Sequence, residues 1–188
     1  MSYQTKSDES LSVQLPDQSI IDLKPGTQIS FNKWVYQFSR SMDMQGQAVF
    51  SVVKGEGFKV NSPKGTVSVL GTIFEINTNT GFRVNCYSGR VLVEEKQEEK
   101  VLTANQYYQE NKVHSNGERD LNFQRASTSL IVRFIEEFYQ VNISYSSELN
   151  QKYTGSIPLT DVNGAMKSLC LPMGLDYTMK EPGKYSIK

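Results

Sequence analysis

Hydrophobic and polar residues alternate in short runs over the first two-thirds of the chain, and turn-forming residues separate these runs. The most distinctive run occupies residues 66–76 and reads Thr-Val-Ser-Val-Leu-Gly-Thr-Ile-Phe-Glu-Ile. Its β-branched and aromatic residues follow the two-residue period of a strand, except around Gly71, where the alternation breaks. The pattern therefore predicts a strand with a kink at this glycine.

Similar runs lie on both sides of this segment, between turn-forming residues. They predict strands at residues 11–15, 20–23, 28–31, 34–39, 48–53, 58–61, 82–87, 90–95 and 101–107. Strands this short and this regularly spaced are typical of an all-β sandwich or β-roll, which we expect over residues 11–109. Residues 1–10 have no periodicity and predict a flexible lead-in. The charged run at residues 96–100 predicts a solvated hairpin tip.

A polar run at residues 110–120, with a turn-forming Asn116-Gly117 pair, predicts a linker. Beyond the linker the period changes from that of strands to that of an amphipathic helix, with Ser127 or Thr128 as the N-cap. The apolar residues that give this period are Leu130, Ile131, Phe134, Ile135 and Phe138.

A second helix is predicted after Asp161, which can cap it, and Pro172 and Gly174 end it. Strand-like runs are present at residues 121–123, 141–145, 153–157, 175–179 and 185–187. The order of elements is therefore βαβ followed by βαββ, which predicts a small α+β domain over residues 121–188. The fold class expected for the whole chain is mainly β plus α+β.

Charge and hydropathy narrow the range of partners. Twenty basic and twenty acidic side chains cancel, so the chain has no electrostatic signature of a nucleic-acid binder or of a protein drawn to anionic lipid. We expect a protein partner and no nucleic acid. No run approaches the ~18 apolar residues of a membrane span, and the first ten residues are polar, so we expect no signal peptide or anchor within the chain.

Candidate catalytic and metal-binding residues are few. His114 is the only histidine and lies in the predicted linker, so a zinc site or a Ser-His or Cys-His nucleophile would lack its partner. Cys86 and Cys170 are interpreted as buried free thiols, with a disulfide as the alternative. Paired carboxylates are adjacent in sequence and point in different directions, which argues against a glycosidase. These pairs are Glu94 with Glu95, Glu98 with Glu99, and Glu136 with Glu137. We therefore expect no enzyme activity, no metal and no cofactor.

Three aromatic residues, Trp34, Tyr36 and Phe38, would share one face of the strand predicted at residues 34–39. We interpret them as part of the sandwich core. The alternative function is a glycan-binding β-module that uses them as a stacking platform.

Residues 15–23 read Leu-Pro-Asp-Gln-Ser-Ile-Ile-Asp-Leu, and residues 46–52 read Gly-Gln-Ala-Val-Phe-Ser-Val. Further motifs lie at residues 58–60, 69–76, 89–93 and 101–106. In this order and spacing the motifs resemble the periplasmic region of FecR-family anti-sigma factors, of the kind that accompanies TonB-dependent transporters in Bacteroidetes-like bacteria. Gln18 stands where the family favours glycine, and Gln47 stands where it favours glutamate. The second region is similar to the short N-terminal domain of secretins and TonB-dependent receptors, at residues 134–143, 153–157 and 169–177.

The resemblance implies a single-pass regulator. Its cytoplasmic part would hold a sigma factor, and its periplasmic part would sense the loaded state of an outer-membrane transporter. We expect the cytoplasmic part and the inner-membrane anchor to be absent from this chain, and residues 1–10 to be a tether. The expected partner is the signalling domain of the transporter, which would pair with an exposed strand edge of the second domain. The candidate edges carry Val141, Ile143 and Tyr145, or Tyr185 and Ile187.

Overall fold

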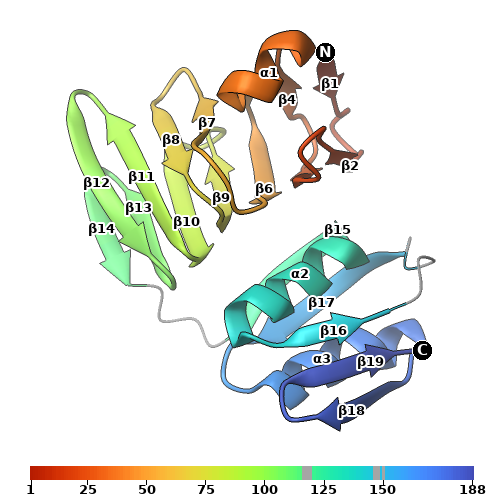
Figure 1. Ribbon diagram of the computed structural model, residues 1–188. Coiled ribbons are helices and arrows are strands. Elements are labelled where there is room, and N and C mark those ends of the chain that lie inside the picture. Colours follow the sequence, from red (N-terminus) through yellow and green to blue (C-terminus); the bar gives the residue numbers. More distant parts are fainter. Residues whose placement is uncertain (116–119, 146–148, 150) are drawn as a thin grey trace. The chain divides into compact units, whose positions relative to one another are not determined.

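The computed structural model describes residues 1–115, 120–145, 149 and 151–188 of the 188-residue chain. The chain divides into two compact units, Met1–Asn116 and Gly117–Lys188 (Figure 1). Each unit has its own buried apolar residues.

Within the described residues, the first unit contains two seven-stranded sheets. The first sheet has the order β1 (Ser2–Gln4), β4 (Gln28–Ser30), β5 (Ser41–Gln45), β7 (Phe58–Asn61), β8 (Thr66–Val69), β11 (Arg90–Glu95) and β12 (Glu98–Thr103). The second sheet has the order β14 (Lys112–Ser115), β13 (Gln106–Gln109), β10 (Arg83–Ser88), β9 (Ile73–Asn77), β6 (Gln47–Ser51), β3 (Ile20–Leu23) and β2 (Leu11–Gln14). Neighbouring strands are antiparallel except β5 and β7, which are parallel.

The inward side chains of both sheets form one core, as the alternating pattern predicts. The ring of Phe50 on β6 stacks on that of Phe74 on β9, with centroids 4.8 Å apart. It also meets the edge of Phe58 on β7, in the other sheet, at 6.2 Å. The predicted sandwich of β-sheets is therefore confirmed, although this unit also contains a helix.

The run at residues 66–76 is not one kinked strand. Its first half is β8, in the first sheet, and its second half is β9, in the second sheet. Gly71 lies where the chain passes from one sheet to the other, and a Cβ there would lie 2.6 Å from Cα of Lys54. The glycine is required because the backbone of Lys54 leaves no room for a side chain.

The prediction of a strand at residues 34–39 is wrong, because this segment belongs to helix α1 (Lys33–Ser39). The side chain of Asn32 caps the helix by accepting hydrogen bonds from the backbone N–H groups of Trp34 and Val35. Arg40 ends it in the left-handed conformation, with φ 42° and ψ 43°.

Two segments expected to be irregular contain strands. β1 lies within residues 1–10 and pairs with β4, so this segment is not a flexible lead-in throughout. β14 lies within the predicted linker and pairs with β13, where His114 stacks on Tyr107 with ring centroids 4.8 Å apart. Residues 101–107 are divided between β12 and β13. The hairpin tip within residues 96–100 is confined to Lys96 and Gln97, because β12 begins at Glu98.

The second unit has the predicted order βαβ followed by βαββ. It comprises β15 (Asp120–Ser127), α2 (Thr128–Tyr139), β16 (Asn142–Ser144), β17 (Lys152–Pro158), α3 (Val162–Cys170), a short 3-10 turn η1 (Leu171–Met173), β18 (Tyr177–Glu181) and β19 (Lys184–Ile187). Ser127 caps α2 and Asp161 caps α3, as expected. Gly174 ends η1 in the left-handed conformation.

Its strands form two small sheets within the described residues. β15 pairs with β17, and the other sheet has the order β16-β19-β18. β16 is parallel to β19, whereas β18 is antiparallel to it. Helix α2 contacts β15, β16 and α3, and helix α3 contacts β17, so the apolar faces of both helices are buried within this unit.

Candidate functional site

The part of the chain that the structure describes holds no group of three or more His, Cys, Asp or Glu side chains that could bind a metal ion. Several carboxylates take part in structural contacts instead. Glu95 accepts a 2.6 Å hydrogen bond from the hydroxyl of Tyr108, and Glu94 lies 3.9 Å from the ammonium of Lys59. Cys86 and Cys170 are buried free thiols, so the predicted thiol state is confirmed.

Glu75 on β9 binds three side chains from the neighbouring strands of the second sheet. It accepts hydrogen bonds from the amides of Gln47, at 2.7 Å, and Asn85, at 3.0 Å. A third comes from the hydroxyl of Tyr87, at 2.5 Å. These contacts engage both carboxylate oxygens and tie β6, β9 and β10 together, so we interpret the cluster as structural.

The two candidate partner-binding strands, β16 and β19, differ in whether they lie at an edge of their sheet. β19, which carries Tyr185 and Ile187, is the middle strand of its sheet and pairs on both sides. Both side chains are buried. The prediction that this strand offers an exposed edge is therefore wrong.

β16 is an edge strand of the same sheet, but its outward backbone donor is occupied. The N–H of Asn142 points inward and donates to the carbonyl of Gly183 in the turn before β19, at 2.8 Å. The N–H of Ile143 donates to Oε1 of Glu136 on α2, also at 2.8 Å. A side chain from the covering helix thus closes part of this edge, which is a common way to protect an edge strand. Tyr145, just beyond β16, is 41% exposed.

The other edge of this sheet is β18. Asp176 and Lys188 exchange both backbone hydrogen bonds at its start. Because such pairs alternate in an antiparallel ladder, the backbone groups of Tyr177 and Met179 point away from β19. Most of the side chains of β18 are exposed, including Met179 at 59%. Within the described residues, β18 pairs with β19 alone. The sequence alone does not reveal this edge, because it does not give the order in which the strands pair.

In the first unit, helix α1 presents aromatic residues to solvent. Trp34 is 79% exposed and Phe38 is 83% exposed, whereas Tyr36 is buried. The Tyr36 ring lies 5.0 Å from that of Phe31 and 6.4 Å from that of Phe58. The assignment of all three predicted aromatics to the core is therefore wrong for Trp34 and Phe38, because a helix places them on a different face from Tyr36.

An ion pair fixes the end of α1 to the turn of the motif at residues 15–23. The guanidinium of Arg40 donates to Oδ2 of Asp17 through Nη2, at 2.6 Å, and through Nε, at 2.9 Å. It also donates to the carbonyl oxygens of Val53 and Glu56. Burial raises the pKa of Asp17, but hydrogen bonds from Arg40 and Ser19 outweigh it and hold that pKa below its ordinary value.

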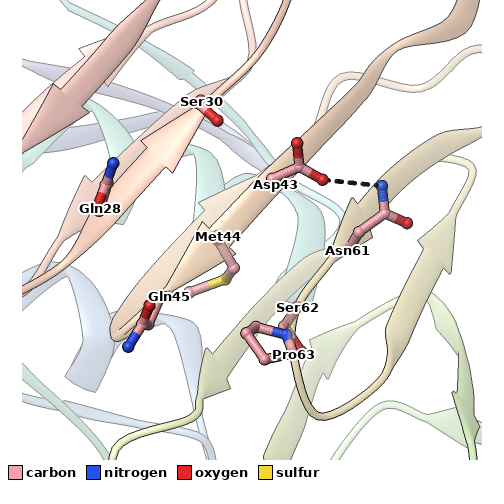
Figure 2. Close-up of a pocket in the computed structure, with 8 residues that line it drawn as sticks. All are labelled: Gln28, Ser30, Asp43, Met44, Gln45, Asn61, Ser62 and Pro63. Carbon is pink, nitrogen blue, oxygen red and sulfur yellow. Dashed lines mark hydrogen bonds between the residues drawn. The ribbon is translucent and has the colours of Figure 1, made fainter.

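A hollow of about 380 Å³ lies on the outer face of the first sheet (Figure 2). It is lined by Gln28, Ser30, Asp43, Met44, Gln45, Asn61, Ser62 and Pro63. The amide of Asn61 donates to Oδ1 of Asp43 at 3.3 Å. A second hollow, of about 720 Å³, shares Ser30 and Asp43 with the first and reaches Trp34. The smaller hollow therefore collects amide, carboxylate and hydroxyl groups from β4, β5 and β7, and it adjoins the larger hollow that Trp34 lines.

No helix among the described residues is long and apolar enough to cross a membrane.

Comparisons with known proteins match both units. The family model described as FecR protein matches residues 1–92, and the model described as FecR, C-terminal, matches residues 120–186. Two crystal structures of a candidate anti-sigma factor from Parabacteroides distasonis ATCC 8503, at 1.65 and 2.50 Å resolution, are similar to this chain with a TM-score of 0.55 and 19% identity. The similarity covers 100% of this chain and 98% and 97% of those chains. At this identity it supports the fold alone. A comparison with curated proteins gives no match.

Proposed function

Because the chain belongs to the FecR family of anti-sigma factors, we propose that it is the sensory region of such a regulator. In this proposal the chain lies in the periplasm and receives the state of a TonB-dependent outer-membrane transporter by contact with the transporter's signalling domain. A cytoplasmic part outside this chain binds the sigma factor, and an inner-membrane helix joins the two. The chain itself carries out no reaction.

The observation that carries the proposal is the open edge of β18 in the second unit. Its outward backbone groups, at Tyr177 and Met179, can pair with an added strand. Backbone pairing supplies affinity without a charged surface, in keeping with the balanced charge of the chain. The exposed side chain of Met179 adds an apolar contact.

The β16 edge, with Val141, Ile143 and Tyr145, is the competing contact. A strand added there must displace Glu136 from the N–H of Ile143. This displacement would leave the carboxylate without its backbone donor, so β16 is the weaker site. Tyr185 and Ile187 do not contact the added strand in either case, because they lie on the middle strand, β19, which pairs with both edge strands.

Two substitutions, Met179→Pro and Glu136→Ala, distinguish binding at β18 from binding at β16. Their effects are measured by calorimetric titration with the purified signalling domain of the transporter. Met179→Pro removes the outward N–H of residue 179 and leaves that of Tyr177, and Met179→Ala is its matched control because it keeps both N–H groups. We expect the proline variant to bind at least about ten-fold more weakly than the alanine variant, the equivalent of one lost hydrogen bond and the strain around it.

Glu136→Ala frees the N–H of Ile143 and opens the β16 edge. We expect its affinity for the signalling domain to equal that of the unmodified chain. Tighter binding of the signalling domain by Glu136→Ala, together with equal binding by the two Met179 variants, would show that the contact is at β16 and not at β18. The absence of binding by the unmodified chain would reject the sensory proposal.

A further inference from the structure

We propose that the outer face of the first sheet, together with Trp34, binds a neutral β-linked oligosaccharide. The site comprises the two adjoining hollows and the exposed side of α1. The inference does not depend on the proposed sensory function, because it concerns the other unit and a different class of ligand.

Trp34 and Phe38 are both exposed on α1. Large aromatic side chains bury roughly 150–250 Å² each when they pack, so a fold that leaves two of them open gives up a substantial stabilisation. The exposure is fixed by the surrounding structure. Asn32 caps the start of α1, Arg40 ties its end to Asp17, and Tyr36 is packed beneath it. The helix therefore fixes the backbone of Trp34, which is one of the residues that line the larger hollow.

The lining of the smaller hollow is polar. Gln28, Gln45, Asn61 and Asp43 supply planar amide and carboxylate groups from β4, β5 and β7 (Figure 2). Such groups donate and accept hydrogen bonds, as vicinal sugar hydroxyls require. The hydrogen bond from Asn61 to Asp43 sets the orientation of this pair before a ligand arrives, which lowers the cost of ordering on binding.

The two hollows are large enough for a small oligosaccharide and adjoin each other. Hollows of about 380 and 720 Å³ fall within the roughly 300–1,000 Å³ range of small-molecule sites. They share Ser30 and Asp43, so one extended ligand can occupy both. A β-linked chain is extended and flat, and its ring faces present C–H groups that stack on an indole.

Other ligand classes fit less well. Among the described residues, Lys33 is the one basic side chain that lines the two hollows, and the lining also contains the acidic Asp43. Nucleic acid and anionic lipid both require a cluster of basic groups. An apolar protein surface would match Trp34 and Phe38, but it would bury the amides and the carboxylate without partners. A saccharide has both a ring face for the indole and hydroxyls for the polar lining.

Trp34 is the only tryptophan in the chain, so its fluorescence reports on this site directly. The full chain is titrated with cellotriose and with N-acetylglucosamine trimer, each to about 10 mM, well above the ~1 mM dissociation constant expected for so open a site. We expect a saturable change in emission with at least one of them. No saturable change with either sugar would overturn the proposal.

Two variants that keep Trp34 locate the binding. The double substitution Asp43→Ala with Asn61→Ala should weaken saccharide binding at least about ten-fold, because it removes hydrogen-bond partners, one of them charged. Ser68→Ala is the matched control, on β8 of the same sheet and outside both hollows, and should bind like the unmodified chain. Circular dichroism verifies that both variants fold. Equal binding by the double variant and the control would overturn the assignment of the site.

Discussion

The ion pair between Asp17 and Arg40 gives the most quantitative test of how the first unit is held together. We consider the substitution Asp17→Ala. It removes two hydrogen bonds from Arg40 and two from Ser19, at donor–acceptor distances of 2.6 to 3.0 Å. The loss detaches the turn at residues 15–23 from the end of α1.

The magnitude follows from the burial of the pair. The side chains of Arg40 and Asp17 are 13% and 20% exposed, so the pair is neither fully buried nor fully exposed. Removing one partner of a fully buried pair costs about 3–5 kcal/mol, whereas an exposed pair contributes less than about 1 kcal/mol. Arg40 also keeps its bonds to the carbonyls of Val53 and Glu56. We therefore expect Asp17→Ala to lower the free energy of unfolding by about 2–3 kcal/mol.

The assay is urea denaturation followed by the fluorescence of Trp34, which lies in the first unit and is the only tryptophan. Lys59→Ala is the matched control, because Lys59 is 3.9 Å from Glu94 in an exposed pair and should contribute less than about 0.5 kcal/mol. A difference of less than about 0.5 kcal/mol between Asp17→Ala and the unmodified chain would refute the reasoning.

The loss of stability caused by Asp17→Ala also depends on pH, and the pKa of Asp17 sets the direction of this dependence. This pKa is lower in the folded chain than its ordinary value. The stabilisation is therefore complete above the unfolded pKa and is lost as the pH falls through the folded one. The difference between Asp17→Ala and the unmodified chain should be constant between about pH 5 and 7 and should shrink below about pH 4.

Two further predictions concern other parts of the chain. Gly71→Ala places a Cβ against the backbone of Lys54 and should lower the free energy of unfolding by about 1–3 kcal/mol. Gly57→Ala is the control, because nothing lies within 4 Å of a Cβ there, and it should change that free energy by less than about 0.5 kcal/mol. Equal effects of the two substitutions in urea denaturation would contradict the sheet crossing at Gly71. Burial raises the pKa of the Cys86 thiol to about 12 and that of Cys170 to about 11, so a disulfide reagent at pH 8 should modify neither thiol in the folded chain and both in urea. Rapid modification of the folded chain would show that a thiol is accessible.

Local sequence patterns predicted most strands and both helices of the second unit. Where the pattern was ambiguous, tertiary contacts decided the structure. Trp34, Tyr36 and Phe38 have the two-residue period of a strand, but seven residues are too few to distinguish that period from a short helix. The cap at Asn32 was the available sign of a helix. At Gly71 the break in alternation was visible, but whether the chain bends or changes sheets depends on strands far away in sequence.

The candidate sites depended even more on long-range pairing. Tyr185 and Ile187 were expected on an exposed edge, but parallel pairing with β16 encloses their strand. Nothing local predicts that pairing. The polar hollow combines Gln28, Asp43 and Asn61 from three strands, so no short motif contains it. The Glu136-Glu137 pair was visible in the sequence, but the bond from Glu136 to the β16 backbone required the fold.

Hydrogen exchange of the backbone amides, with and without the signalling domain of the transporter, tests the central claim most directly. Strand addition at β18 predicts that the amides of Tyr177 and Met179 become protected on binding, while the amide of Ile143 keeps the protection that Glu136 already provides. Protection that instead increases at Ile143, or that changes nowhere in the second unit although the two proteins bind, would contradict the account.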